Sequence, residues 1–133
     1  MTLPTPEQLS KANTEDAHQV AFFCWCASNT SRFPLLKTIF HVPNGALRDK
    51  ITASRLKAAG VRAGVWDVCL PVSDASGRYK GAWIEFKHGR NGLTDEQKQF
   101  QANLAGQHWA WFVSYTWYDA AQAVEKYLTT GWN

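Results

Sequence analysis

The chain has 133 residues, of which 45% are hydrophobic, 14% aromatic and 19% charged. This composition is too apolar and aromatic for a disordered chain and too mixed for a coiled coil. At ~150 residues per domain, the length predicts one domain over residues 1–133, with 1–13 as a short lead-in. The longest apolar run, residues 20–27, is far shorter than the ~20 residues that cross a bilayer, and no secretory signal is visible. We therefore expect a cytoplasmic protein.

The formal charge of +3 is unevenly distributed along the sequence. Residues 32–90 carry eleven basic side chains against four acidic ones, whereas the two flanks carry three basic and seven acidic side chains. A basic middle segment is typical of a face that binds a polyanion, because each phosphate contact releases counterions. A solvated surface explains the same charges equally well.

The hydrophobic pattern predicts helices and strands in alternation. Residues 34–42 fit one helical turn followed by an extended segment. We predict helices over 14–28, 46–59, 94–105 and 116–128, and strands over 65–70, 79–87 and 108–114. The order helix, strand, helix, strand, strand, helix, strand, helix indicates an α/β sandwich with a mixed sheet.

Two of these helices have a predicted inward face. In 14–28 the apolar stripe comprises Ala17, Val20, Ala21 and Cys24, and in 46–59 the inward residues are Leu47, Ile51, Ser54 and Ala58. The basic residues of 46–59 fall in two rows beside that stripe, Arg48 with Arg55 and Lys50 with Lys57. Both rows are candidates for phosphate contacts, or for the solvated flanks of an amphipathic helix.

A candidate catalytic cluster lies on the two central strands. Alternation puts Trp83, Glu85 and Lys87 on one face of 79–87, and a hairpin with 65–70 would bring Asp67 close to Glu85. Two adjacent carboxylates repel unless a cation joins them, and Mg²⁺ or Mn²⁺ prefers such oxygen ligands. The lysine could then polarise a water that attacks phosphorus. The alternative is an ordinary salt bridge between Glu85 and Lys87.

Four separated motifs resemble the VRR-NUC family, a branch of the PD-(D/E)XK nuclease superfamily. They occur in the family's order, and the resemblance runs from about Glu15 to Leu128. The motifs are His41 to Gly45, Arg55 to Asp67, Trp83 to Lys87 and Leu93 to Gln97.

The resemblance implies a restriction-endonuclease-like αβββαβ core and a metal-dependent catalytic site. Its metal-binding acids fall on Asp67 and Glu85, its catalytic lysine on Lys87, and its helical glutamine on Gln97. The main-chain carbonyl of Phe86 would complete the metal shell, with Glu15 as a further possible ligand. One departure is Trp66, which stands where the family usually has proline.

Similarity to standalone members, of bacterial or phage type, implies Mg²⁺-dependent cleavage of DNA, with Mn²⁺ able to substitute. It points to branched DNA, such as four-way junctions or flaps, and to a homodimer. The aromatic C-terminal third, with Trp109, Trp111, Trp117 and Trp132, is the candidate dimer interface. The candidate DNA-binding residues are Asn44, Arg48, Lys50, Arg55, Lys57, Arg62, His88 and Arg90.

Two other functions remain open from the sequence. The basic middle segment would suffice for a catalytically silent nucleic-acid-binding module, although the intact Asp67, Glu85 and Lys87 favour an enzyme. A sequence-specific, restriction-type nuclease is the second alternative, and the chain shows no added recognition domain.

Overall fold

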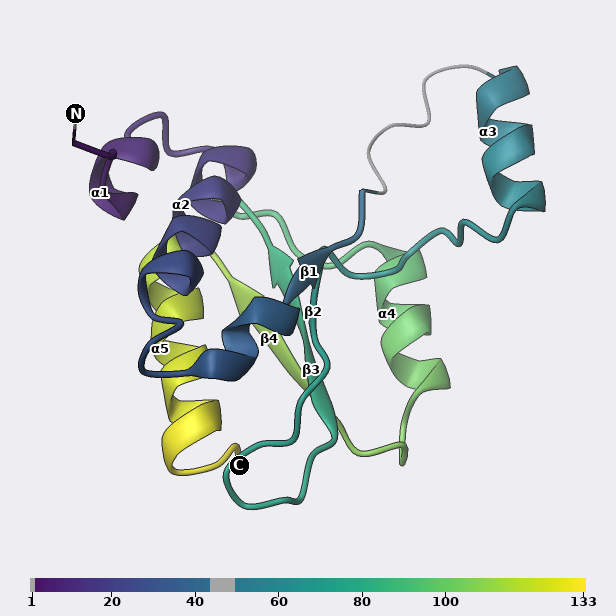
Figure 1. Cartoon of the computed structure of the whole chain (residues 1–133). Coiled ribbons are helices and arrows are strands. Elements are labelled where there is room, and N and C mark those ends of the chain that lie inside the picture. Colours follow the sequence, from purple (N-terminus) through teal and green to yellow (C-terminus); the bar gives the residue numbers. More distant parts are fainter. Residues whose placement is uncertain (1, 44–49) are drawn as a thin grey trace.

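The fold is an α/β arrangement in the computed structural model of the chain, which describes residues 2–43 and 50–133, apart from the side chain of Lys50. Its elements alternate as the hydrophobic pattern predicts (Figure 1). In chain order they are α1 (Pro6–Leu9), α2 (Glu15–Ser28), the 3₁₀ helix η1 (Pro34–Thr38), β1 (Phe40–His41), α3 (Lys50–Ala58), β2 (Val68–Leu70), β3 (Gly81–Phe86), α4 (Asp95–Asn103), β4 (Trp109–Ser114) and α5 (Trp117–Thr129).

The sheet is mixed, with strand order β1-β2-β3-β4. β1 pairs with β2 and β2 pairs with β3 in antiparallel fashion, and β4 is parallel to β3. The β2–β3 register places Val68 opposite Ile84, so Asp67, one residue before β2, lies at the level of Glu85 and Phe86. The hairpin that the sequence predicted for the acid pair is therefore confirmed.

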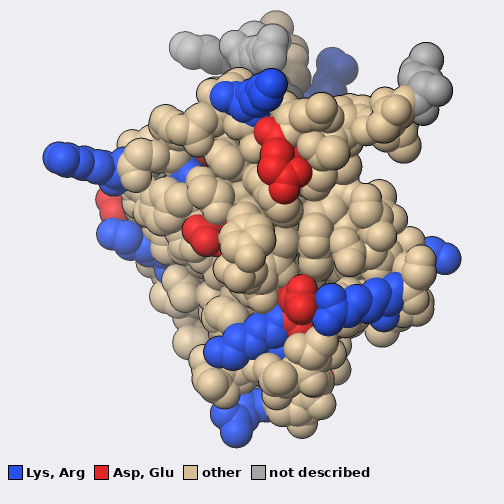
Figure 2. Space-filling model, turned by 90° about the vertical axis from the view of Figure 1, so that its left-hand side faces the viewer, with Lys and Arg blue, Asp and Glu red and all other residues tan. Residues whose placement is uncertain are grey.

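Helices cover the two faces of the sheet unequally (Figure 1). α2 and α5 pack together on one face, over a core that includes Phe22, Ile84, Phe86 and Val124. Figure 2 views this side, where uncharged residues form most of the surface, and lysines and arginines lie at its margins and, beside an acidic residue, across its lower part. α4 lies on the other face, against the side chains of Trp83 and Glu85. The catalytic candidates are thus on the α4 side.

Helix α2 buries a different stripe from the one that its sequence suggested. Val20 is 47% exposed and Cys24 is half-buried, whereas His18, Ala21, Phe22 and Cys26 are buried. The aromatic side chain of Phe22 fills more of the core than an alanine or valine could, and this selects the face that turns inward. Of the predicted stripe, Ala21 is buried and Ala17 and Cys24 are half-buried, so the prediction was wrong at Val20.

Helix α3 does not bury the face predicted for it. Ile51 is 75% exposed, and Ser54 and Ala58 are also exposed; Leu47 lies outside the described residues. Figure 1 shows α3 standing away from the body of the molecule. The prediction assumed that every amphipathic pattern meets a core, but the sheet faces are already covered by α2, α5 and α4.

His18 joins the start of α2 to the start of α5. Its Nδ1 accepts a hydrogen bond from the Trp117 amide at 3.0 Å, and its Nε2 therefore carries the proton that it donates to Asn13 Oδ1 at 2.8 Å. Burial and the nearby His88 lower the pKa of His18, which favours this neutral ring. His18 thus has a structural role, since it links the two helices that cover this face of the sheet.

Candidate active site

Asp67 and Glu85 form a directly bonded pair at one end of the sheet. The Asp67 amide donates to Glu85 Oε1 at 3.0 Å, and the Phe86 amide donates to Asp67 Oδ2 at 3.0 Å. Each carboxylate thus accepts a hydrogen bond from main chain at or next to the other acid. These two bonds keep adjacent two carboxylates whose like charges repel.

Gln97 fixes the orientation of Glu85 from helix α4. Its Nε2 donates to Glu85 Oε2 at 2.7 Å, while its Oε1 accepts from the Thr94 amide at 2.9 Å. The second bond is half of the capping box at the start of α4, the helix that the sequence predicted over residues 94–105. The Gln97 side chain therefore both caps the start of α4 and orients Glu85. The position of α4 and the orientation of Glu85 are thus linked through one residue.

Lys87 completes the cluster immediately after β3. Its Nζ lies 3.4 Å from Glu85 Oε2, and its side chain is only 9% exposed. Its amide donates to the Ser114 carbonyl, which continues the pairing with β4 and aims the side chain toward the Glu85 face. A buried ammonium is stable only beside an opposite charge, so the lysine and the acid pair depend on one another.

The electrostatics of the cluster favour uptake of a cation. Burial and the nearby Asp67 carboxylate raise the pKa of Glu85 to about 7, against the lowering effects of the Asp67 amide, Lys87 and Gln97. The positive charge of Lys87 does not fully compensate the negative charges of Asp67 and Glu85. A divalent cation would stabilise both carboxylates in their charged form.

The segment before Asp67 is held against α4 by Trp66 and Gly64. Trp66 is fully buried, packs edge-on against Trp111, and donates from Nε1 to the Gln97 carbonyl at 3.1 Å. Gly64 has φ +84, and a Cβ there would collide with the main-chain carbonyl of Glu96. Trp66, where the family usually has proline, is thus a packed part of the wall between the acid pair and α4.

The donor atoms of this cluster fit a hard metal ion. Asp67 and Glu85 offer only oxygen, and within residues 2–43 and 50–133 no hydrogen bond engages the Asp67 Oδ1 atom. The same residues contain no group of three or more His, Cys, Asp or Glu side chains that could hold a metal. Glu15 therefore does not join the acid pair in this conformation, and its role as a ligand stays a prediction.

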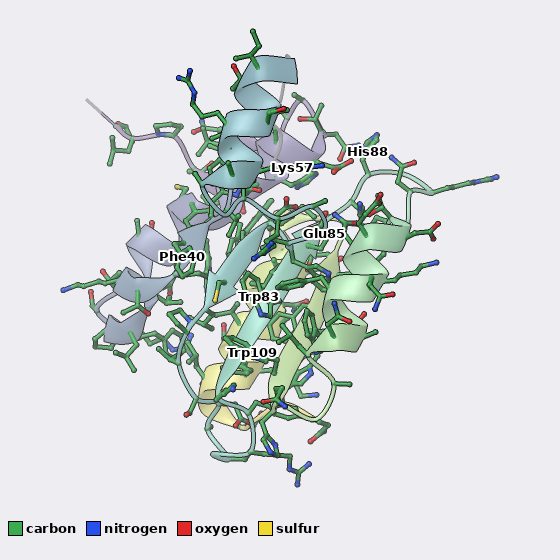
Figure 3. The ribbon with its side chains drawn as sticks, turned by 90° about the vertical axis from the view of Figure 1, so that its right-hand side faces the viewer. Phe40, Lys57, Trp83, Glu85, His88 and Trp109 are labelled. Atoms are coloured by element: carbon green, nitrogen blue, oxygen red, sulfur yellow. The ribbon has the colours of Figure 1, made fainter. Side chains whose placement is uncertain are left out.

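The candidate DNA-binding residues are divided between two segments at the catalytic end of the sheet. Figure 3 looks onto the α4 side, where Trp109, Trp83 and Glu85 follow one another toward the end that also carries Lys57 and His88. Those that the structure describes are all exposed: Arg55 and Lys57 on α3, Arg62 beyond it, and His88 and Arg90 after β3. Asn44, Arg48 and the side chain of Lys50 lie outside the described residues.

The basic middle segment does not form one continuous face. Lys87 is buried, and Arg32 pairs with Glu125 of α5 at 3.1 Å. Arg78 and Lys80 line a hollow with His108 where β3 begins, at the opposite end of that strand from Lys87. The excess positive charge that the sequence shows is therefore relevant to the site only in part, through α3 and the segments next to it.

A functional contact that the sequence did not reveal comes from His41. Its Nδ1 lies 2.8 Å from the carbonyl oxygen of Asp67. The only signal in the sequence was the place of His41 at the start of the motif His41 to Gly45. The pairing of a two-residue strand with β2 could not be foreseen from that signal.

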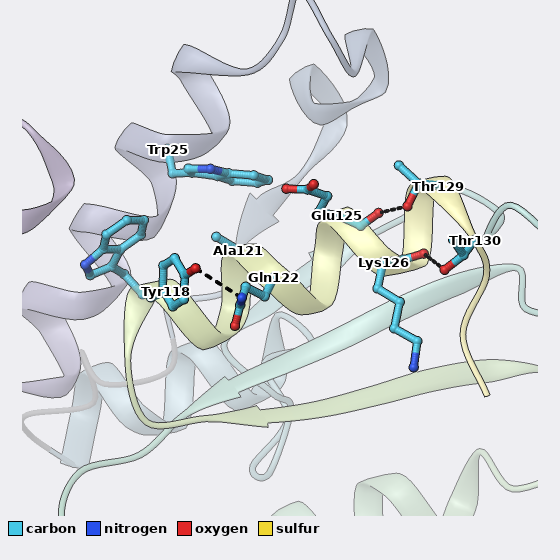
Figure 4. Close-up of a pocket in the computed structure, with 9 residues that line it drawn as sticks. Trp25, Tyr118, Ala121, Gln122, Glu125, Lys126, Thr129 and Thr130 are labelled. Carbon is cyan, nitrogen blue, oxygen red and sulfur yellow. Dashed lines mark hydrogen bonds between the residues drawn. The ribbon is translucent and has the colours of Figure 1, made fainter.

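A groove in the described surface lies away from the acid pair. It has a volume of about 430 Å³ and is lined by residues of α2 and α5, among them Trp25, Tyr118 and Gln122 (Figure 4). Glu125 at its edge is already paired with Arg32. Among the described residues, this groove included, no group of three or more His, Cys, Asp or Glu side chains could hold a metal ion.

The four tryptophans of the expected dimer interface are half-buried and engaged with other rings. Trp109 packs on Trp83, Trp111 on Trp66, Trp117 on Tyr118 and Trp132 on Phe112. Aromatic residues at such spacing fill both sides of the sheet instead of forming one apolar surface. The large apolar side chains that are exposed include Val20, Leu35, Phe40, Ile51 and Tyr118.

Comparison of the sequence with protein-family models and with curated proteins gives no match. A search of solved structures finds a VRR_NUC domain protein that is 28% identical, with a TM-score of 0.68 over 86% of this chain and 87% of that one. This structure confirms the resemblance to the VRR-NUC family that the sequence motifs predicted. It also confirms the restriction-endonuclease-like fold, a mixed four-stranded sheet flanked by helices. None of the described helices is long and apolar enough to span a membrane.

Proposed function

We propose that this protein is a Mg²⁺-dependent DNA endonuclease. The observation that carries the proposal is the cluster of Asp67, Glu85 and buried Lys87, in which the Lys87 ammonium lies 3.4 Å from Glu85. An ordinary surface salt bridge would be solvated, whereas this one is buried and placed beside a second acid. Burying charged side chains costs desolvation free energy, and such buried charges are typical of catalytic or binding sites.

Each residue of the cluster has a separate role in the proposed site. Asp67, Glu85 and the main-chain carbonyl of Phe86 would hold the cation, with Glu15 as a possible additional ligand and Mn²⁺ as a substitute. A bound Mg²⁺ supplies Lewis-acid stabilisation of the charge that develops on the phosphate. Lys87 donates a hydrogen bond to the attacking water and orients it toward phosphorus. Gln97 keeps Glu85 in the rotamer that faces Asp67.

The substrate is proposed to be branched DNA, such as a four-way junction or a flap, bound by the exposed basic residues of α3 and of the turn after β3. Phosphate contacts from such residues position the DNA without reading its sequence. Resolution of a four-way junction requires two symmetry-related cuts, which a two-fold homodimer provides from one gene. Light scattering with and without junction DNA tests the dimer, and a monomer under both conditions would refute it.

A silent DNA-binding module is the second candidate function. It is favoured only by the exposed Arg55, Lys57 and Arg62, which would bind a phosphate backbone without any metal. It gives no reason for the burial of Lys87 beside Glu85. The two candidates differ in one outcome, because a binding module leaves labelled DNA intact at every metal concentration.

The Asp67→Asn variant tests the proposal by replacing one carboxylate oxygen of Asp67 with an amide nitrogen. Asparagine keeps an oxygen that can accept the Phe86 amide but lacks the charge, so the fold should persist while cleavage falls by more than about 100-fold. Asp95→Asn, at the exposed start of α4, is the matched control and should cut like the wild type. Undiminished cleavage of labelled DNA by Asp67→Asn in Mg²⁺ would refute the assignment.

A further inference from the structure

His41 contacts the main-chain carbonyl of Asp67, whereas the Asp67 carboxylate is bonded elsewhere, to the Phe86 amide. The carbonyl oxygen of Asp67 accepts two hydrogen bonds from the β1 side, one from the Val42 amide at 2.7 Å and one from His41 Nδ1 at 2.8 Å. Since a carbonyl oxygen can only accept, Nδ1 must carry the proton. The ring is therefore fixed in one orientation by its contact with the acid.

The placement of Asp67 depends on few regular contacts. β1 is only two residues long and pairs through Phe40 with Cys69 and through His41 with Val68. Asp67 itself precedes β2 and is not part of a strand. On its other side, the Asp67 amide donates to Glu85 Oε1 at 3.0 Å. The peptide is thus held between β1 and Glu85, and His41 supplies one of the two bonds from β1.

His41 lies on β1, the edge strand of the sheet, and donates from its side chain to a carbonyl of the adjoining segment. His41 is exposed, so burial of its ring does not explain the contact. What the bond does is fix the main chain from which the Asp67 carboxylate extends toward Glu85. In sites of this kind, groups that orient a ligand affect metal affinity without touching the metal.

We infer that His41 is a positioning residue, which holds Asp67 in the geometry that binds a divalent cation by donating Nδ1–H to its main-chain carbonyl. The inference rests on the proposed function, since it concerns the same cation. It assigns His41 no contact with DNA and no proton transfer. It follows that cation binding requires a hydrogen-bond donor at the position of Nδ1 and does not require the rest of the imidazole ring.

Two amide substitutions separate these parts of the ring. The amide nitrogen of asparagine can occupy the position of Nδ1, whereas that of glutamine lies farther out, near the position of Nε2. His41→Asn should therefore retain the bond to Asp67, and His41→Gln should lose it as His41→Ala does. His108→Asn is the matched control, because His108 is an exposed histidine immediately before β4.

The test is Mn²⁺ binding by titration calorimetry on the full chain, with thermal unfolding in chelator as the measure of folding. We expect His41→Ala and His41→Gln to bind Mn²⁺ about 10-fold more weakly, and His41→Asn and His108→Asn to bind within about 3-fold of wild type. Wild-type affinity in His41→Ala, or equal weakness in His41→Asn and His41→Gln, would overturn the inference. A wild type that neither binds Mn²⁺ nor cuts DNA would overturn the proposed function, and His41's role with it.

Discussion

The acid–lysine cluster and helix α3 represent opposite ways of presenting charged side chains. In the cluster, Glu85 and Lys87 are 3% and 8% exposed, and Glu85 is held by the Asp67 amide, by Gln97 of α4 and by Lys87 itself. On α3, Arg55 and Lys57 are exposed, and the apolar Ile51 is exposed beside them. Chemistry at phosphorus needs groups held within fractions of an ångström, whereas phosphate contacts tolerate movement. The two regions match these two requirements.

Replacement of Lys87 is expected to have the largest effect of the tests that follow. Lys87→Met keeps the aliphatic stem but removes the donor, so turnover should fall by about 100-fold while Mn²⁺ binding at pH 8 changes little. Lys98→Met, on the outer side of α4, is the control and should leave cleavage unchanged. If Mn²⁺ affinity fell and turnover did not, the lysine would belong to the metal shell and its proposed role would be wrong.

The raised pKa of Glu85 predicts how stability depends on pH in metal-free protein. Because the pKa is about 7 in the folded chain and near 4 when unfolded, the folded state binds more protons between these values. The free energy of unfolding should therefore fall as pH rises from 5 to 8, by on the order of 1 kcal/mol for each pKa unit. Denaturant titrations in chelator measure this fall.

Glu85→Gln serves as the reference for that measurement. The variant keeps an oxygen for the Asp67 amide and does not titrate, so its pH dependence over the same range should be flatter. An equally steep fall in the variant would show that another group is responsible.

The basic residues of α3 should act on binding alone. Arg55→Ala and Lys57→Ala should each reduce the slope of log affinity for DNA against log salt by about one unit. Turnover at saturating DNA should not change, since neither side chain touches the acid pair. Lys126→Ala, on α5 at the other face, is the control. An unchanged slope in the double variant would mean that α3 faces away from the DNA.

The smallest effect is expected from the apolar residue of α3. Ile51 is 75% exposed, so Ile51→Ser should change the free energy of unfolding by less than about 0.5 kcal/mol. Ile84→Ala in the fully buried centre of β3 should cost about 2 to 5 kcal/mol. Thermal unfolding of both variants compares the regions directly, and comparable losses would show that α3 packs on the protein in solution.

The sequence predicted most of the fold because its signals were local. The hydrophobic pattern predicted a helix from residue 94, close to the observed start of α4 at Asp95, and strand alternation placed Glu85 and Lys87 on one face. Bounds differed where the chain is irregular: the strand expected from Val65 begins at Val68, because the preceding residues are held against α4 by Gly64 and Trp66.

The parts that could not be predicted depend on tertiary packing. The inward face of α2 is decided by which side chain fits above Phe86, and Phe22 fits better than Val20. The exposure of α3 follows from the lack of a free sheet face, which periodicity does not encode. The bond from His41 to Asp67 joins residues 26 positions apart through a two-residue strand, too short to leave a pattern.

Metal-dependent cleavage of DNA by the wild-type chain is the central claim, and one assay tests it most directly. Labelled four-way junction and linear duplex of equal length are incubated with the protein in Mg²⁺, in Mn²⁺ and in chelator. The account predicts cleavage with either metal, faster on the junction, and intact DNA in chelator. Intact junction in both metals, or cleavage that persists in chelator, would contradict it.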